Sequence, residues 1–199
     1  LLENNIFNDS DIYMSTDPIH LNDIQPVYED GPFWKKGDVF LSLLRNSSII
    51  HYRPETDQLI NFIKGPFFEQ HDIDILSENE ISIFNNNNSL MDDKKYSELL
   101  VYNFETKKFK KILSDQFESK NFKTETEGLA DFSKNGSIMV EETNGGRILF
   151  YNEKGNLEWE FVNVSNDGKI YPVSWSRLIS NVSMVKNIKD SIKNQKCSN

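Results

Sequence analysis

The chain is poor in cysteine and histidine and has no long hydrophobic segment. Its single cysteine, Cys197, excludes a disulfide within the chain and says little about the redox compartment. No apolar run approaches the roughly 20 residues that a membrane-spanning helix needs, and no signal peptide is visible. The three histidines lack close metal-ligand spacing, and no cysteine pair supports a zinc site, so we expect no metal centre.

Positive charge is also scarce. The 22 basic residues face 31 acidic ones, which gives a net charge of −9 and argues against a nucleic-acid partner. Basic residues gather only in the C-terminal tail, which we interpret as a solvated helix or a disordered end. The lysines there are Lys186, Lys189, Lys193 and Lys196. With 199 residues and 37% hydrophobic content, the chain is long enough for one domain with a substantial core.

The sequence does contain a repeat. Three segments with similar patterns open successive blocks, at residues 20–24 (HLNDI), 71–76 (HDIDIL) and 127–132 (EGLADF). Each block then reaches a hairpin built around a tyrosine, and these tyrosines, Tyr52, Tyr102 and Tyr151, are 50 and 49 residues apart. Short strands repeated at this period are typical of β-propeller blades.

The predicted fold class is therefore all-β, a β-propeller. Strands are expected from β-branched and aromatic content at residues 39–43, 48–52, 81–84, 137–140, 147–152 and 157–162. An insert at residues 28–37 has the Gly and Pro content of a loop, and its Phe33 and Trp34 are expected to fold back over an apolar surface or a channel mouth. A turn at residues 154–156 supplies a glycine suited to positive φ.

The predicted organisation is a lead-in or the end of a preceding blade at 1–19, blades at 20–182, and a tail at 183–199. Within the blades, repeats span about 20–65, 71–113 and 127–163, with a partial repeat at 173–182. Typical propellers have about four to eight blades. Because the chain begins with Leu1, in mid-pattern, we expect it to be the C-terminal part of a longer propeller.

These motifs resemble the bacterial arylsulfotransferase (arylsulfate sulfotransferase) family and related arylsulfotransferase-like propellers. The resemblance covers most of residues 18–180. It is carried by residues 20–24, by QHDIDIL at 70–76 with IFNN at 83–86, and by the hairpin GRILFYN at 146–152 with LEWEFV at 157–162.

The resemblance implies a six-bladed propeller whose central channel holds the active site, and an exported, periplasmic protein. It implies transfer of a sulfuryl group from an aryl sulfate to a phenol through a sulfated histidine, without a nucleotide donor, so no cofactor is expected. Imidazole chemistry agrees, because a histidine can act as nucleophile or proton donor near neutral pH. His20 and His71 start equivalent strands, so we predict that both face one channel as catalytic residues.

Four further residues are candidates for substrate binding. A sulfuryl group carries charge on three oxygens and needs donors around it. Asn22 and Asn85 are candidate donors near the channel mouth, Glu127 occupies the third strand start, and Arg177 begins the last block. His51 lies in mid-strand and is expected to face outward.

The chain also departs from the family pattern. The family has an arginine shortly after the segment that corresponds to residues 83–86, where this chain offers only Lys94 and Lys95. The family's nucleophilic histidine lies in a later blade, but no histidine follows His71. The alternative to an enzyme is therefore a non-catalytic propeller that binds a small anionic or aromatic ligand, or a protein. A third reading is a scaffold whose channel is plugged by large side chains.

Overall fold

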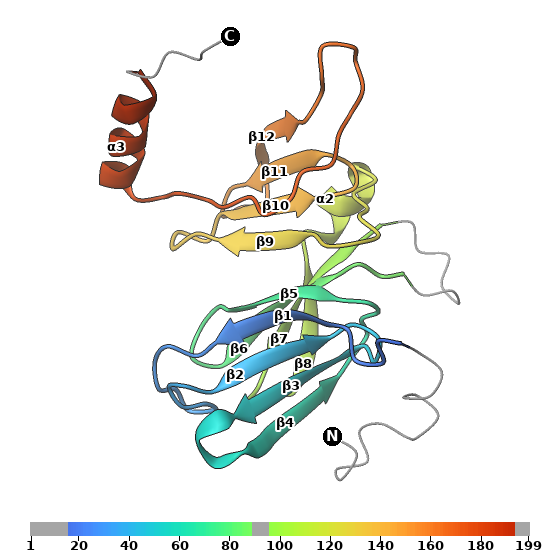
Figure 1. Cartoon of the computed structure of the whole chain (residues 1–199), viewed down its shortest axis with the longest axis vertical. Helices are drawn as coiled ribbons and strands as arrows, with labels where there is room; N and C mark the ends of the chain where they lie inside the picture. Colours follow the sequence, from blue (N-terminus) through green and yellow to red (C-terminus); the bar gives the residue numbers. More distant parts are fainter. Residues whose placement is uncertain (1–15, 89–95, 194–199) are drawn as a thin grey trace.

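The computed structural model describes residues 16–88 and 96–193. These parts form three four-stranded antiparallel sheets with few helices (Figure 1). Sheet 1 contains β1 (Leu21–Pro26), β2 (Val39–Leu43), β3 (Ser48–Arg53) and β4 (Gln58–Lys64). Sheet 2 contains β5 (His71–Ile75), β6 (Glu80–Asn85), β7 (Glu98–Asn103) and β8 (Lys108–Ile112). Sheet 3 contains β9 (Leu129–Phe132), β10 (Ile138–Glu142), β11 (Arg147–Tyr151) and β12 (Leu157–Val162).

In each sheet the strands pair in sequence order, so each sheet is an up-and-down meander. The first strands of the sheets lie together, because β1 contacts β5 and β5 contacts β9. The predicted all-β class is confirmed. Strands β2 and β12 have the predicted bounds, whereas residues 173–179, predicted to begin a further block, form no strand.

The helices lie outside the sheets. They are the short 3-10 helix η1 (Pro54–Thr56), α2 (Ser114–Ser119) and the C-terminal α3 (Val182–Lys193). The helix expected in the tail is therefore present, and it has no buried residue. In the described parts of the chain, no helix has the length and apolar character that crossing a membrane requires.

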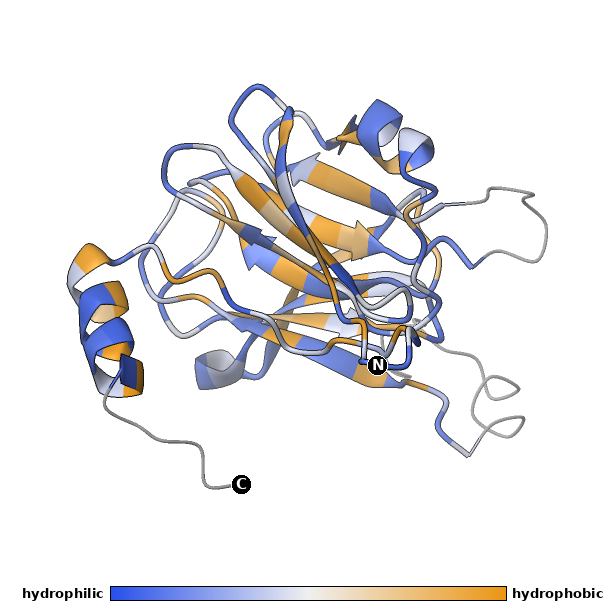
Figure 2. Cartoon of the chain, turned by 90° about the horizontal axis from the view of Figure 1, so that it is seen from above, coloured by the Kyte–Doolittle hydropathy of each residue, from blue (hydrophilic) through white to orange (hydrophobic). Residues whose placement is uncertain are grey.

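Aromatic side chains fill the space between sheets 1 and 2. Trp34, from the 28–37 insert, is buried with its ring 5.7 Å from that of Phe40 and 5.3 Å from that of Phe104. Both contacts are edge-to-face, the arrangement that aromatic rings prefer. The insert thus folds back over an apolar surface, as predicted. A second cluster lies between sheets 2 and 3, and the orange strands in Figure 2 show this apolar interior.

The prediction that His51 faces outward is wrong. Its side chain is fully buried on β3, and its Nε2 lies 2.8 Å from Oδ2 of Asp38, which also pairs with Arg53. Burial lowers the pKa of His51. Burial also opposes the charge on Asp38, but hydrogen bonds from Arg53, Lys35 N–H and His51 outweigh it and hold the pKa of Asp38 below its usual value. His51 lies on the same face of β3 as Ile49, and this face packs in the core, where the His51 ring is 4.6 Å from that of Phe40.

Candidate functional site

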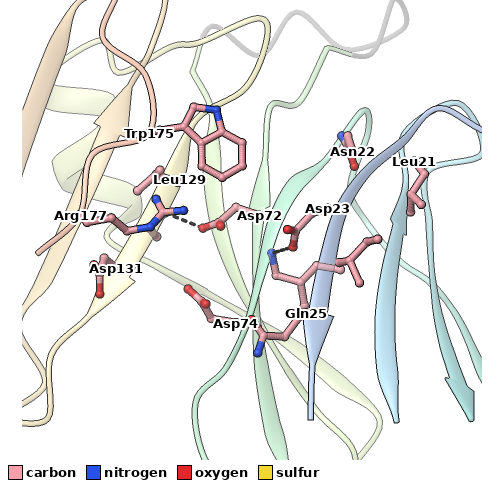
Figure 3. Close-up of a pocket in the computed structure, with 13 residues that line it drawn as sticks. Leu21, Asn22, Asp23, Gln25, Asp72, Asp74, Leu129, Asp131, Trp175 and Arg177 are labelled. Carbon is pink, nitrogen blue, oxygen red and sulfur yellow. Dashed lines mark hydrogen bonds between the residues drawn. The ribbon is translucent and has the colours of Figure 1, made fainter. Parts of the chain in front are cut away.

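Two adjoining cavities lie where the first strands of the three sheets meet. The smaller, which we call the histidine cavity, has a volume of about 320 Å³ and includes His20, Asn22, His71, Glu127, Trp175 and Arg177 in its wall. The larger, which we call the aspartate cavity, has a volume of about 640 Å³ and includes Asp23, Asp72, Asp74 and Asp131 (Figure 3). Seven residues line both cavities: Leu21, Asn22, Asp23, Asp72, Leu129, Trp175 and Arg177.

The backbone is unusual where each first strand begins. Three residues other than glycine have positive φ there: His20 (48°), Asp72 (31°) and Glu127 (56°). The pairing register of β1 and of β5 also shifts near its start, which marks a bulge. Left-handed backbone at such residues costs about 1–2 kcal/mol each and is often found at functional sites. Bulges and strained residues here re-aim side chains at the strand starts.

Hydrogen bonds fix the ring of His71. Its Nδ1 lies 2.8 Å from Oδ1 of Asn86 and 3.2 Å from the carbonyl oxygen of Glu69, and both partners are acceptors. The Asn86 amide is oriented in turn, because its Nδ2 donates to the carbonyls of Thr124 and Glu127. We therefore assign the hydrogen of the neutral ring to Nδ1. Nε2 is left as an acceptor, and it receives the Glu127 N–H at 3.3 Å.

Electrostatics favours the same neutral form. Burial lowers the pKa of His71, and the nearby charge of His20 acts in the same direction. Hydrogen bonds to Asn86 and Glu69 act against this shift but do not overcome it. At neutral pH the His71 ring therefore carries a lone pair on Nε2.

His20 is held differently. Its Nδ1 lies 2.7 Å from Oδ2 of Asp17, and its side chain is 43% exposed. The backbone N–H of His20 donates to the other oxygen of the same carboxylate at 2.9 Å. Asp17 therefore pairs with Nδ1 of His20, and Nε2 is the ring nitrogen that can interact with a ligand in the cavity.

Asn22 uses its side-chain amide within the protein. Its Nδ2 donates to the carbonyl of Gln70 at 2.7 Å, while its Oδ1 is buried without a hydrogen-bond partner among the described residues. Gln70 is fully buried, and its own Nε2 is within hydrogen-bond distance of Ser42 Oγ and of the carbonyls of Leu43 and Ser48. Gln70 thus ties the start of β5 to sheet 1 and places His71 beside β1.

Glu127 also makes contacts that connect separate segments of the chain. Its carboxylate accepts a hydrogen bond from Ser174 Oγ at 2.8 Å, and its backbone contacts both His71 and Asn86. It therefore lines the cavity and joins β9 to the 174–178 segment.

Asn85 does not reach either cavity, so the prediction of a substrate contact there needs correcting. Its side chain is fully buried, with Oδ1 accepting the N–H groups of Phe68 and Asn87 and Nδ2 donating to Glu98. These bonds stabilise the connection before β5. The lysines considered as substitutes for the family arginine, Lys94 and Lys95, lie outside the described residues.

Carboxylates join each first strand to the next segment. Asp23 accepts the N–H of Ile73 at 2.8 Å, and Asp72 accepts the N–H of Ala130 at 2.8 Å. In the same way Asp131 accepts the N–H of Leu178 at 2.9 Å. Sequence reasoning missed this role, although each block opening contains an aspartate that signalled it.

The aspartate cavity concentrates negative charge. Burial and the neighbouring Asp74 raise the pKa of Asp72 well above its usual value. Burial, with the charges of Asp131 and Asp23, raises the pKa of Asp74 to about 6. The Arg177 guanidinium opposes both shifts. Arg177 is therefore the cation in the cavity wall that offsets the negative charge of Asp72 and Asp74.

The comparison with known families now bears on this geometry. The model of a family described as Arylsulfotransferase (ASST) matches residues 4–164, most of the chain. This chain belongs to the arylsulfotransferase family. The arylsulfotransferase match includes all three sheets and both cavity histidines, and it ends before the 174–178 segment.

Other comparisons add little to the arylsulfotransferase assignment. One similar solved structure is a protein of unknown function from Bacteroides caccae, with 13% identity and a TM-score of 0.47. The match covers 62% of this chain and 44% of that one, so this chain spans less than half of that protein's length. No curated protein matches. Within residues 16–88 and 96–193, no three His, Cys, Asp or Glu side chains are grouped so that they could hold a metal ion.

Proposed function

We propose that this protein transfers a sulfuryl group from an aryl sulfate to a phenolic acceptor in the histidine cavity. The observation that carries the proposal is the fixed, neutral ring of His71, which has Nε2 as its acceptor atom and lines the same cavity as His20. Membership in the arylsulfotransferase family supports the same reaction class. The three meandering sheets, packed through their first strands, support blades of a six-bladed propeller around this cavity.

In the first half-reaction, Nε2 of His71 attacks the sulfur of the donor. The N–S bond forms, the S–O bond to the aryl group breaks, and the phenolate leaves. His20 in its protonated form donates a proton from Nε2 to the departing oxygen, while Asp17 holds its Nδ1. Asn86 keeps the hydrogen on Nδ1 of His71, so that Nε2 is the attacking atom.

In the second half-reaction, the oxygen of the acceptor phenol attacks the sulfur. The O–S bond forms and the N–S bond breaks, while His20 takes the acceptor's proton and is reset. Each half-reaction thus leaves the enzyme ready for the other.

The two imidazoles favour the histidine cavity for the sulfuryl group. Arg177 lines both cavities, and its guanidinium offers donors for sulfuryl oxygens. Each cavity is lined by four carboxylate side chains, and only the histidine cavity adds His20 and His71. A second arginine, Arg45, is exposed in the turn after β2, next to Leu44, whose N–H donates to the His20 carbonyl.

The test is transfer from 4-nitrophenyl sulfate to phenol, followed by release of 4-nitrophenol. We expect the wild type to turn over, and a sulfated peptide containing His71 to be found by mass spectrometry when no acceptor is added. His71→Ala should lose turnover, and added imidazole should restore part of it by occupying the vacated space. Glu153→Gln, at an exposed turn position, is the control and should retain full activity.

Two results would contradict the proposal. One is a folded wild type with no turnover between pH 6 and 9. The other is a His71→Ala variant that remains as active as the control. A binding module is the alternative, and the Glu127 N–H that already occupies Nε2 of His71 favours it. That alternative would show ligand binding without turnover.

A further inference from the structure

Trp175 is exposed in a way that large aromatic residues seldom are. Its side chain lies in the wall of both cavities, yet the residue is 74% exposed. Its φ is +62°, a left-handed conformation that is a clear outlier for a bulky residue. Neither core packing nor backbone preference therefore explains a tryptophan here. Strained residues of this kind persist only where the surroundings hold them, and they are frequent at ligand sites.

Carboxylates from sheet 3 hold the chain on both sides of this residue. On the N-terminal side, Ser174 Oγ donates to Glu127 at 2.8 Å. On the C-terminal side, the N–H of Ser176 donates at 2.7 Å to Glu141, a buried carboxylate. Two residues further on, the N–H of Leu178 donates to Asp131 at 2.9 Å. These contacts fix the 174–178 segment although it forms no strand.

The ring of Trp175 is paired with a cation. The guanidinium carbon of Arg177 lies 5.2 Å from the ring centroid, within the range of a cation–π contact. Figure 3 shows the indole and the guanidinium entering the cavity region from the same segment, opposite Asp72 and Asp23. An aromatic surface and an anion-binding group thus stand two residues apart on one fixed segment.

We propose that Trp175 is the platform on which the aromatic ring of the substrate stacks, with its anionic group directed to Arg177. The inference rests on the proposed function for the identity of the reaction, and it adds the residue that recognises the aryl group of the donor. Aromatic pairs gain stacking energy beyond the area that they bury, and a saturated ring cannot. Trp175 is therefore the residue that selects aromatic donors.

The experiment measures binding without chemistry. Isothermal titration calorimetry compares benzylsulfonate with cyclohexylmethanesulfonate, two anions of similar size whose C–S bond prevents sulfuryl transfer. We expect the wild type to bind the aromatic ligand about 3- to 10-fold more tightly, the factor that corresponds to one aromatic pair. In Trp175→Gly, which suits a φ of +62°, this ratio should fall to about one, while Trp175→Phe should keep most of it.

Trp159→Phe is the matched control. Trp159 lies on β12, stacks on Phe150 and lines neither cavity, so its replacement should leave the ratio unchanged. The inference is overturned if the wild-type ratio is about one, if Trp175→Gly keeps the wild-type ratio, or if the control changes it equally. Because no turnover is needed, the ratio can behave as expected in a protein that transfers no sulfuryl group. That outcome would support the stacking role of Trp175 and contradict the proposed sulfuryl transfer.

Discussion

Replacing Asp74 by asparagine should stabilise the protein, and the gain should grow with pH. The Asp74 carboxyl lies in the wall of the aspartate cavity, where burial and the charges of Asp131 and Asp23 raise its pKa from 3.8 to about 6. Between these two values the folded protein keeps a proton that the unfolded chain has released. Ionised Asp74 therefore costs stability, and the cost appears as the pH rises through this window.

The magnitude follows from the size of the shift. The difference between 3.8 and about 6, at about 1.4 kcal/mol per pKa unit, gives a cost of about 3 kcal/mol once the group is fully ionised in both states. At pH 5 the same linkage gives about half of that, because the folded protein is then still mostly protonated. Asp74→Asn removes the charge while nearly keeping the shape.

Urea unfolding followed by circular dichroism at pH 5 and pH 8 measures the effect. We expect Asp74→Asn to exceed the wild type by about 1.5 kcal/mol at pH 5 and by about 3 kcal/mol at pH 8. Glu153→Gln, an exposed carboxylate in a turn, should change stability by less than about 0.5 kcal/mol at either pH. A variant that is less stable than the wild type at pH 8, or a gain that does not change with pH, would refute the reasoning.

Two further substitutions test the polar framework. Asn86→Ala removes the hydrogen bonds that its side chain makes to the Thr124 and Glu127 carbonyls and to His71, so stability should fall by about 2–3 kcal/mol. The Asn86 contact raises the pKa of His71, so an NMR titration should show that pKa falling further, and an unchanged value would contradict the contact between the two side chains. Asp38→Asn removes a buried carboxylate that pairs with the partly buried Arg53 and with His51, and it should cost about 1–3 kcal/mol in urea unfolding at pH 7. A loss below about 0.5 kcal/mol would mean that these contacts do not stabilise the fold.

Local sequence patterns predicted the strands well because each strand carries its own signal. Residues 39–43 and 157–162 are β-branched and aromatic, and both form strands with those bounds. Residues 173–179 have a similar composition and form no strand. The N–H groups of Ser176 and Leu178 donate to carboxylates, as those of Ile73 and Ala130 do on β5 and β9, but the described chain continues into α3 and supplies no second strand to pair with. Composition cannot say which partner a backbone group will find.

The site was only partly predictable for the same reason. His20, His71 and Arg177 were singled out from their places at block openings, and the structure brings all three to one cavity. Asn85 had an equally suggestive place and is instead buried in contacts with Phe68 and Glu98.

The order of residues along this chain determined the all-β class, the spacing of its hairpins and the positions of two histidines at strand starts. These properties follow from side-chain periodicity and turn chemistry, which act over a few residues. Only the tertiary structure decided which nitrogen of His71 carries the hydrogen, that Asn22 donates to the Gln70 carbonyl, and that Trp175 stands exposed beside Arg177. Such features depend on contacts between residues far apart in the sequence. Asp72 and Ala130, for example, are 58 residues apart, and their hydrogen bond forms only when sheets 2 and 3 pack together.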